Sequence, residues 1–161
     1  MTDNASAGSV VIERTFDEPI EIIWNMWTDP VHVQAWYGPD GASIPEIALD
    51  VRVGGHRRLC MEVATPDGPT RMWFTGHYLE VDQPHRLVFT EAMTSAPIDP
   101  PLDDDVPPGH SATTITVEFQ AVGSRTKMVM THAGIPADSP AKSGWTMAFD
   151  KLATRATTQR T

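Results

Sequence analysis

Between residues 43 and 133 the apolar residues recur at every second position through six successive stretches, and this period constrains the fold more than any other feature. The clearest stretch is 111–121, in which Ile115, Val117 and Phe119 alternate with polar residues. Such alternation is typical of a strand with one buried and one solvated face. Short turns such as Gly54-Gly55 join most neighbouring stretches, so we predict antiparallel pairing. The predicted strands are 43–53, 56–65, 70–82, 85–94, 111–121 and 125–133.

Helical patterns lie on both sides of this region. A first strand, 10–16, precedes a short amphipathic helix whose apolar residues recur at helical spacing, and Asp17 is predicted to cap that helix. Asp29-Pro30 repeats the pattern of cap and proline, which predicts a second helix ending near Trp36. A terminal helix is predicted over 139–156, with Ser139 as its cap. Its apolar stripe consists of Ala141, Trp145, Ala148, Phe149, Leu152 and Ala156.

The order of these elements predicts an α+β fold. An antiparallel sheet with one apolar face needs a cover, and only the terminal helix, about 27 Å long at roughly 1.5 Å per residue, is long enough. We therefore predict a curved seven-stranded antiparallel sheet wrapped around that helix, with an internal cavity. The prediction is one domain over 9–156, a flexible segment 1–8 and a frayed end 157–161. The Pro- and Asp-rich stretch 94–110 is predicted to be a loop, either a functional cover or a mobile segment.

Charge and composition restrict the partners. Twelve basic and 21 acidic residues give a formal charge of −9, which argues against nucleic acid and anionic membranes as partners. No apolar run approaches the roughly 18 residues that a membrane-spanning helix needs, and the N-terminus lacks the pattern of a signal peptide, so we expect a cytoplasmic location. Cys60 is the single cysteine, which excludes an internal disulfide.

Motifs for metal and cofactor chemistry are missing from the sequence. The six histidines show neither His-x-His nor His-x-x-x-His spacing, and there is no phosphate loop, dinucleotide fingerprint or nucleophile elbow. We therefore expect no metal and no cofactor.

Several short blocks lie in a fixed order along the chain: Pro19-Ile20-Glu21-Ile22-Ile23-Trp24, Asp29-Pro30, Trp36-Tyr37-Gly38-Pro39, Val53-Gly54-Gly55, Gly76-His77-Tyr78-Leu79-Glu80-Val81, Arg86-Leu87-Val88-Phe89-Thr90-Glu91, Thr131-His132 and Gly144-Trp145. In their order and spacing they resemble the START-like or SRPBCC superfamily, whose fold is called helix-grip. More narrowly, they resemble the family named after the activator of heat shock protein 90 ATPase. The resemblance spans about residues 9–156 and implies a deep apolar cavity between the sheet and the terminal helix; the stretch 94–110 departs from the family pattern.

Strand alternation selects candidate residues for that cavity. Leu87, Phe89, Glu91 and Met93 share one face of the strand 85–94. If this face points inward, Glu91 could bind a ligand hydroxyl or act as a general acid or base. The alternative is a glutamate at the end of a strand that reaches solvent or pairs with an arginine.

The other candidates come from three elements. Met128, Met130 and His132 share a face of the strand 125–133; methionine is an adaptable lining, and His132 is either a hydrogen-bonding or proton-carrying group or a structural histidine. Aromatic residues of the helices either line the cavity or fill the core. In the strand 70–82 both faces carry large side chains, so the pattern does not decide which face points inward. The candidate ligand-binding residues are Trp36, Trp73, His77, Phe89, Glu91, Met128, Met130, His132, Trp145 and Phe149.

Three functions remain as hypotheses. The first is binding of a small apolar or aromatic molecule in the cavity, without covalent chemistry. The second is an enzyme similar to the cyclases and hydrolases of the wider superfamily, with Glu91 and His132 as acid and base. The third is a protein-binding module, either co-chaperone-like or a homodimer formed through an edge strand. A chaperone partner is the least expected, because the sequence shows no appended chaperone-binding half.

Overall fold

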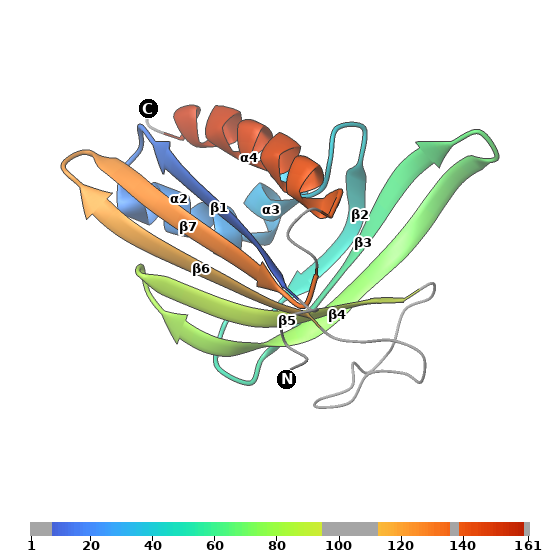
Figure 1. Cartoon of the computed structure of the whole chain (residues 1–161), viewed down its shortest axis with the longest axis horizontal. Helices are drawn as coiled ribbons and strands as arrows, with labels where there is room; N and C mark the ends of the chain where they lie inside the picture. Colours follow the sequence, from blue (N-terminus) through green and yellow to red (C-terminus); the bar gives the residue numbers. More distant parts are fainter. Residues whose placement is uncertain (1–7, 95–112, 136–138, 160–161) are drawn as a thin grey trace.

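The computed structural model describes residues 8–94, 113–135 and 139–159, which form one antiparallel sheet and three helices. The seven strands lie in the order β1-β7-β6-β5-β4-β3-β2, and the sheet bends around the C-terminal helix α4 (Figure 1). The predicted α+β helix-grip architecture is therefore confirmed. The strands are β1 (Ser9–Phe16), β2 (Ser43–Leu49), β3 (His56–Thr65), β4 (Gly68–Asp82), β5 (Arg86–Thr94), β6 (Thr113–Val122) and β7 (Arg125–Ala133). The helices are α2 (Ile20–Thr28), α3 (Pro30–Trp36) and α4 (Ala141–Thr157). The predicted loop 94–110 lies outside the described residues beyond Thr94, as do residues 1–7, 136–138 and 160–161.

Two of the three predicted helix caps are present. Asp29 Oδ1 accepts a hydrogen bond from the Val31 amide at 3.0 Å, and Ser139 Oγ accepts one from the Ala141 amide at 3.1 Å. The prediction for Asp17 was wrong, because α2 begins after Pro19 and Asp17 instead pairs with Arg125 at 2.9 Å.

Strand β2 is shorter than predicted and ends at Leu49. The chain turns in residues 50–55, where the Gly55 amide donates to the Arg52 carbonyl and the Asp50 amide donates to the His56 carbonyl. A Cβ on Gly55 would lie 2.0 Å from the Asp50 carbonyl oxygen, so this turn requires a glycine.

The space between the sheet and the C-terminal half of α4 is filled. Phe149, Leu152 and Ala156 are completely buried. The ring centroid of Trp27 lies 4.8 Å from that of Trp36 and 5.9 Å from that of Phe149, which closes the interior beneath the middle of α4. Burial of each large apolar side chain contributes roughly 1.5–3 kcal/mol, so this half of the domain is its stabilising core.

No described helix is long and apolar enough to cross a membrane.

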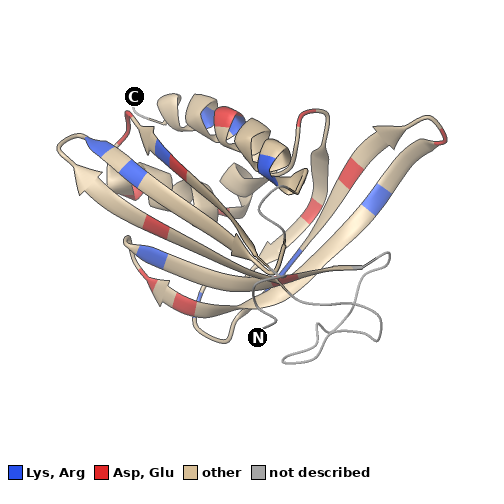
Figure 2. Ribbon diagram, in the orientation of Figure 1, with Lys and Arg blue, Asp and Glu red and all other residues tan. Residues whose placement is uncertain are grey.

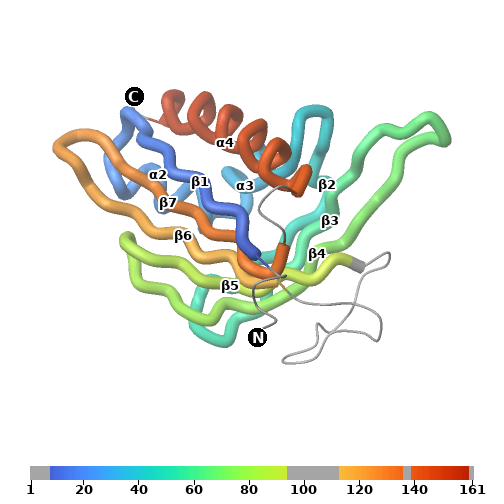
Figure 3. The backbone as a smooth tube through the Cα atoms, viewed as in Figure 1, coloured from blue at the N-terminus to red at the C-terminus, as the bar shows by residue number. Residues whose placement is uncertain are grey.

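The N-terminal half of α4 has different surroundings. Figure 3 shows that the β1–β7 pair and the β3–β4 hairpin rise on either side of α4. The curvature thus carries the inward faces of β3, β4 and β5 around the first turns of α4, beside the segment that follows α3.

Candidate functional site

A pocket of about 740 Å³ lies between the first turns of α4 and the concave face of the sheet. Apart from a few polar side chains, its walls are apolar, and four of the eight methionines in the chain contribute to them. Because a thioether chain is flexible and polarisable, such walls adapt to different occupants. The lining residues are Tyr37, Gly38, Pro39, Met61, Met72, Phe74, Glu91, Met93, His132, Pro140, Ala141, Ser143, Gly144, Trp145, Met147 and Ala148.

The polar end of the pocket is formed by Glu91. Its Oε2 atom accepts a hydrogen bond from the Tyr37 hydroxyl at 2.8 Å and one from Arg57 Nη1 at 2.9 Å. Both partners of the ion pair are buried, with 3% of the Arg57 side chain and 7% of the Glu91 side chain exposed. The guanidinium also lies 3.9 Å from the ring centroid of Phe89. Glu91 therefore points inward, as the first hypothesis from the sequence had it, and it is also paired with an arginine, as the alternative had it.

The surroundings of Arg57 and Tyr37 keep both side chains protonated. Burial works against the charge of Arg57, but Tyr37, Tyr78 and Glu91 more than compensate, so the pKa of Arg57 is raised. Burial and then the neighbouring Glu91 carboxylate hold the pKa of Tyr37 well above 10.0. Arg57 thus stays a cation and Tyr37 stays a hydroxyl that donates to Glu91.

His132 is fixed by hydrogen bonds on both ring nitrogens. The Trp145 indole nitrogen lies 3.1 Å from Nδ1, and because an indole only donates, Nδ1 is the acceptor. The neutral ring then carries its proton on Nε2, which donates to Thr113 Oγ1 at 2.8 Å. Thr113 in turn donates to the Glu91 carbonyl at 3.1 Å. Burial lowers the pKa of His132 and the Glu91 charge only partly opposes this, so the neutral form is favoured.

The structure brings three of the ten candidate residues to this pocket: Glu91, His132 and Trp145. Five others are buried side chains that do not line it: Trp36, Phe89, Met128, Met130 and Phe149. Trp36 is held in the core by a hydrogen bond of 2.7 Å from its indole nitrogen to the Met26 carbonyl.

Trp73 and His77, the two candidates on β4, do not line this pocket. Met72 and Phe74 of β4 face it, and alternation along the strand therefore sends Trp73 and His77 to the opposite face of the sheet. This settles which side of β4 points inward.

Arg57 and Tyr37 were missed by the sequence reasoning. A signal for Arg57 was present, because it shares a face of β3 with the apolar residues Leu59 and Met61 and an inward arginine needs a carboxylate partner. Tyr37 lay within a recognised block but carried no periodic signal of its own, because it follows the last residue of α3.

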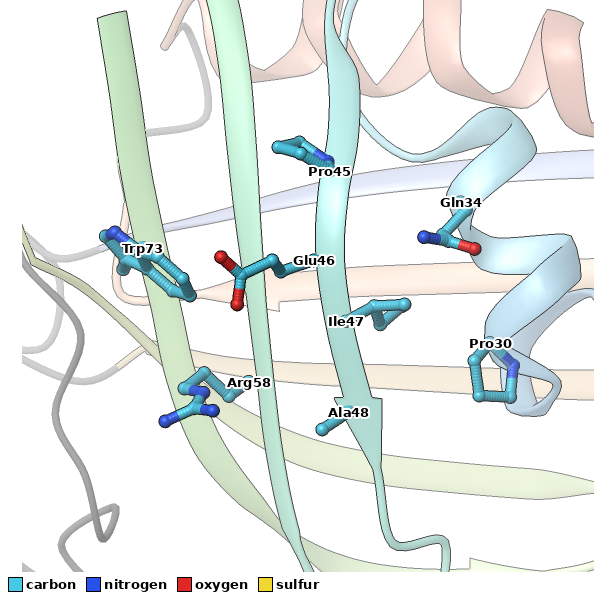
Figure 4. Close-up of a pocket in the computed structure, with 8 residues that line it drawn as sticks. All are labelled: Pro30, Gln34, Pro45, Glu46, Ile47, Ala48, Arg58 and Trp73. Atoms are coloured by element: carbon cyan, nitrogen blue, oxygen red, sulfur yellow. The ribbon is translucent and has the colours of Figure 1, made fainter.

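A second, smaller hollow of about 420 Å³ lies between α3, β2, β3 and β4. Figure 4 shows that it is lined by Trp73, Glu46, Arg58, Pro45, Ile47, Ala48, Gln34 and Pro30. The Arg58 guanidinium stands 5.8 Å from the ring centroid of Trp73. Trp73 thus packs beneath a charged side chain on the face opposite the methionine-lined pocket.

Charges on the exposed face of the sheet are mixed in sign (Figure 2). Arg86 bridges Glu80 at 3.2 Å and Glu118 at 2.6 Å, and Arg71 pairs with Glu62 at 2.9 Å. Exposed pairs of this kind contribute about 0–1 kcal/mol each. In the described part of the chain, no three His, Cys, Asp or Glu side chains are grouped so as to hold a metal ion.

The curved antiparallel sheet, the C-terminal helix and the pocket beside it define a helix-grip protein. The family model described as "Activator of Hsp90 ATPase homolog 1-like protein" matches residues 17–157, and the chain belongs to this family. No curated protein matches the sequence significantly.

Solved structures share the fold along nearly the whole chain. A crystal structure of a Nitrosomonas europaea protein is 21% identical, with 99% of this chain and 100% of that chain covered and a TM-score of 0.76. A Rhodobacter sphaeroides protein is 20% identical, with coverage of 96% and 95% and a TM-score of 0.74. The AHSA1 protein of Silicibacter pomeroyi is 22% identical, with coverage of 95% and 100% and a TM-score of 0.73. At these identities the likeness establishes the fold alone.

Proposed function

We propose that this protein binds a small, mostly apolar or aromatic molecule in the pocket beneath the first turns of α4. The observation that carries the proposal is the pocket itself, with about 740 Å³ of volume and walls of methionine, proline, tryptophan and phenylalanine. Apolar surface removed from water contributes roughly 25 cal/mol per Å², so an occupant that covers these walls gains affinity without any covalent step.

Gly144 offers a direct way to block the pocket. It lies in the lining, and a Cβ added there would have the Pro39 Cβ, at 4.0 Å, as its nearest neighbour. A leucine at this position therefore fits the helix and places its branched end in the pocket. We expect Nile red, an uncharged dye that fluoresces in apolar surroundings, to bind the wild type and to bind the Gly144→Leu variant at least tenfold more weakly.

The matched control is Thr146→Leu, which adds the same side chain to an exposed position of α4 outside the lining. We expect this variant to bind the dye as the wild type does. Equal dye affinity in the wild type and Gly144→Leu, or no dye binding by the wild type, would contradict the proposal.

The enzymatic alternative is favoured by one observation, since Glu91 and His132 line the same pocket. Both side chains, however, are already engaged: Glu91 with Arg57 and Tyr37, and His132 with Trp145 and Thr113. Proton transfer through His132 would break its hydrogen bonds, and a proton on Glu91 would leave the buried Arg57 cation without its counter-charge. The contacts therefore support non-covalent binding more strongly than acid–base catalysis.

Association with a protein partner or a second copy of the chain would use an edge strand. The edges of the sheet are β1 and β2, and Val11 on β1 is 53% exposed. One exposed valine is weak support compared with the pocket. The molecular mass in solution tests for a homodimer independently of ligand binding.

A further inference from the structure

The carboxylate of Glu91 is bonded unevenly. The Tyr37 hydroxyl and Arg57 Nη1 both donate to the same oxygen, Oε2. Two donors that converge on one oxygen fix the rotation of the carboxylate, and they come from the segment after α3 and from β3. The acceptor at the polar end of the pocket is thus held in one orientation before any occupant arrives.

The second oxygen, Oε1, has no donor among the residues that the structure describes. Within residues 8–94, 113–135 and 139–159, no side chain or backbone amide donates a hydrogen bond to Oε1. This oxygen is also absent from the set of fully buried polar atoms without a partner, so it is accessible from the pocket. Glu91 belongs to the pocket lining. An occupant of the pocket therefore meets an ionic acceptor with unused capacity in an otherwise apolar wall.

We propose that the occupant is an apolar molecule carrying a hydroxyl or amino group that donates to Glu91 Oε1. This inference rests on the proposed function and specifies its ligand class. A donor here completes the hydrogen bonding of the carboxylate, whereas an apolar group of the same shape leaves Oε1 desolvated and unpaired. A hydrogen bond to a charged acceptor corresponds to roughly 10- to 100-fold in Kd.

The same arrangement selects against a carboxylate ligand. Arg57 is outside the lining and is already paired, and the polar hydrogens of Tyr37 and His132 point to Glu91 and Thr113. Ser143, the remaining polar side chain of the described lining, is uncharged and exposed. An anion in the pocket would thus meet the Glu91 carboxylate directly, while the Arg57 cation that pairs with it lies outside the lining, in a protein of formal charge −9.

Three naphthalene derivatives separate these contributions: 2-naphthol carries a donor, 2-methoxynaphthalene lacks one, and 2-naphthoate is an anion. We expect isothermal titration calorimetry on the full chain near neutral pH to give a Kd for 2-naphthol at least tenfold below that for 2-methoxynaphthalene, with 2-naphthoate weakest. A difference of threefold or less between the first two compounds, or tightest binding by 2-naphthoate, would overturn the inference. If 2-methoxynaphthalene binds as tightly as 2-naphthol, only the donor preference fails; if no compound and no Nile red binds, the proposed function fails.

Two variants assign the preference to Glu91. The double variant Arg57→Met/Glu91→Met replaces the buried pair by apolar side chains of similar size, a change that folded proteins often tolerate. It should bind 2-naphthol and 2-methoxynaphthalene equally. Tyr37→Phe removes a donor to Oε2 but leaves Oε1 in place, so it should retain the preference for 2-naphthol. Loss of the preference in Tyr37→Phe, with retention in the double variant, would place the acceptor on the tyrosine and refute the inference.

Discussion

Glu91 and Arg57 carry opposite charges in a buried place where an unpaired charge would be costly. Taking each ion out of water costs several kcal/mol, and their attraction offsets this cost only where the geometry is good and further hydrogen bonds are present. Here the pair is joined at 2.9 Å, Tyr37 supplies a second hydrogen bond, and Phe89 lies against the guanidinium. The result is one oriented acceptor, which an exposed glutamate would not provide.

The protonation of His132 leads to a prediction about pH. Its folded-state pKa lies below the ordinary value of 6.5, mainly because the ring is buried. Well above pH 6.5 the ring is neutral in the folded and the unfolded chain alike, so it adds no pH dependence there. Below pH 6.5 the unfolded chain takes up this proton first, so the free energy of unfolding falls as the pH falls, by up to about 1.4 kcal/mol per pH unit.

Urea unfolding from about pH 7.5 to about pH 5.5 measures this contribution. In His132→Gln the free energy of unfolding should fall less steeply below pH 6.5 than in the wild type. His85→Gln is the matched control, because His85 is exposed and lies outside the pocket, and it should keep the wild-type slope. A slope in His132→Gln equal to that of the wild type would show that the ring is not held neutral.

At the scale of single elements, two glycines illustrate opposite requirements. Gly144 lies inside α4 with room for a Cβ, whereas a Cβ on Gly76 of β4 would lie 1.9 Å from the Thr90 carbonyl oxygen of β5. Gly144→Ala should raise the free energy of unfolding by about 0.5–1 kcal/mol, because alanine favours the helix. Gly76→Ala should lower it by about 3 kcal/mol or more, because the β4–β5 pair must separate.

Chemical denaturation of the two alanine variants tests both the predicted rise and the predicted fall in the free energy of unfolding. The substitution is the same in each, so its effect on the unfolded chain is shared and cancels in the comparison. A Gly76→Ala protein as stable as Gly144→Ala would mean that β4 and β5 do not approach as closely as the structure indicates.

Across the whole molecule, the sequence predicted which side chains share a strand face better than it predicted how deeply each side chain is buried. Alternation placed Glu91 on the same face of β5 as Leu87 and Phe89, and in the structure that face points inward. It could not show that Met128 and Met130 would be completely buried while His132, on the same face of β7, would reach the pocket.

Two further features needed the three-dimensional fold. Both faces of β4 carry large side chains, so alternation alone could not choose between them. The pairing of Arg57 with Glu91 joins residues 34 positions apart, on strands that are separated in the sheet by β4. A local pattern contains no information about such a contact, and only the order of strands brings it about.

The interior is thus divided into a filled half and an open half, and Trp145 stands at the boundary. Its ring lines the pocket, and its centroid lies 5.5 Å from that of Phe149 and 6.2 Å from that of Trp27 in the core. Phe149 is completely buried behind it. Removing the Phe149 ring should therefore extend the pocket inward, because Trp145 would lose its support and could move into the vacated space.

We expect Phe149→Ala to lose about 3–5 kcal/mol of unfolding free energy. It should also bind pyrene more tightly relative to naphthalene than the wild type does, as measured by calorimetric titration. Leu152→Ala is the control: it truncates a side chain equally buried, one turn further along α4, at a cost of about 2–5 kcal/mol. Because Leu152 lies beyond Phe149, its loss should leave the pyrene-to-naphthalene affinity ratio unchanged. An equal change of that ratio in both variants would mean that packing near Trp145 does not set the length of the pocket.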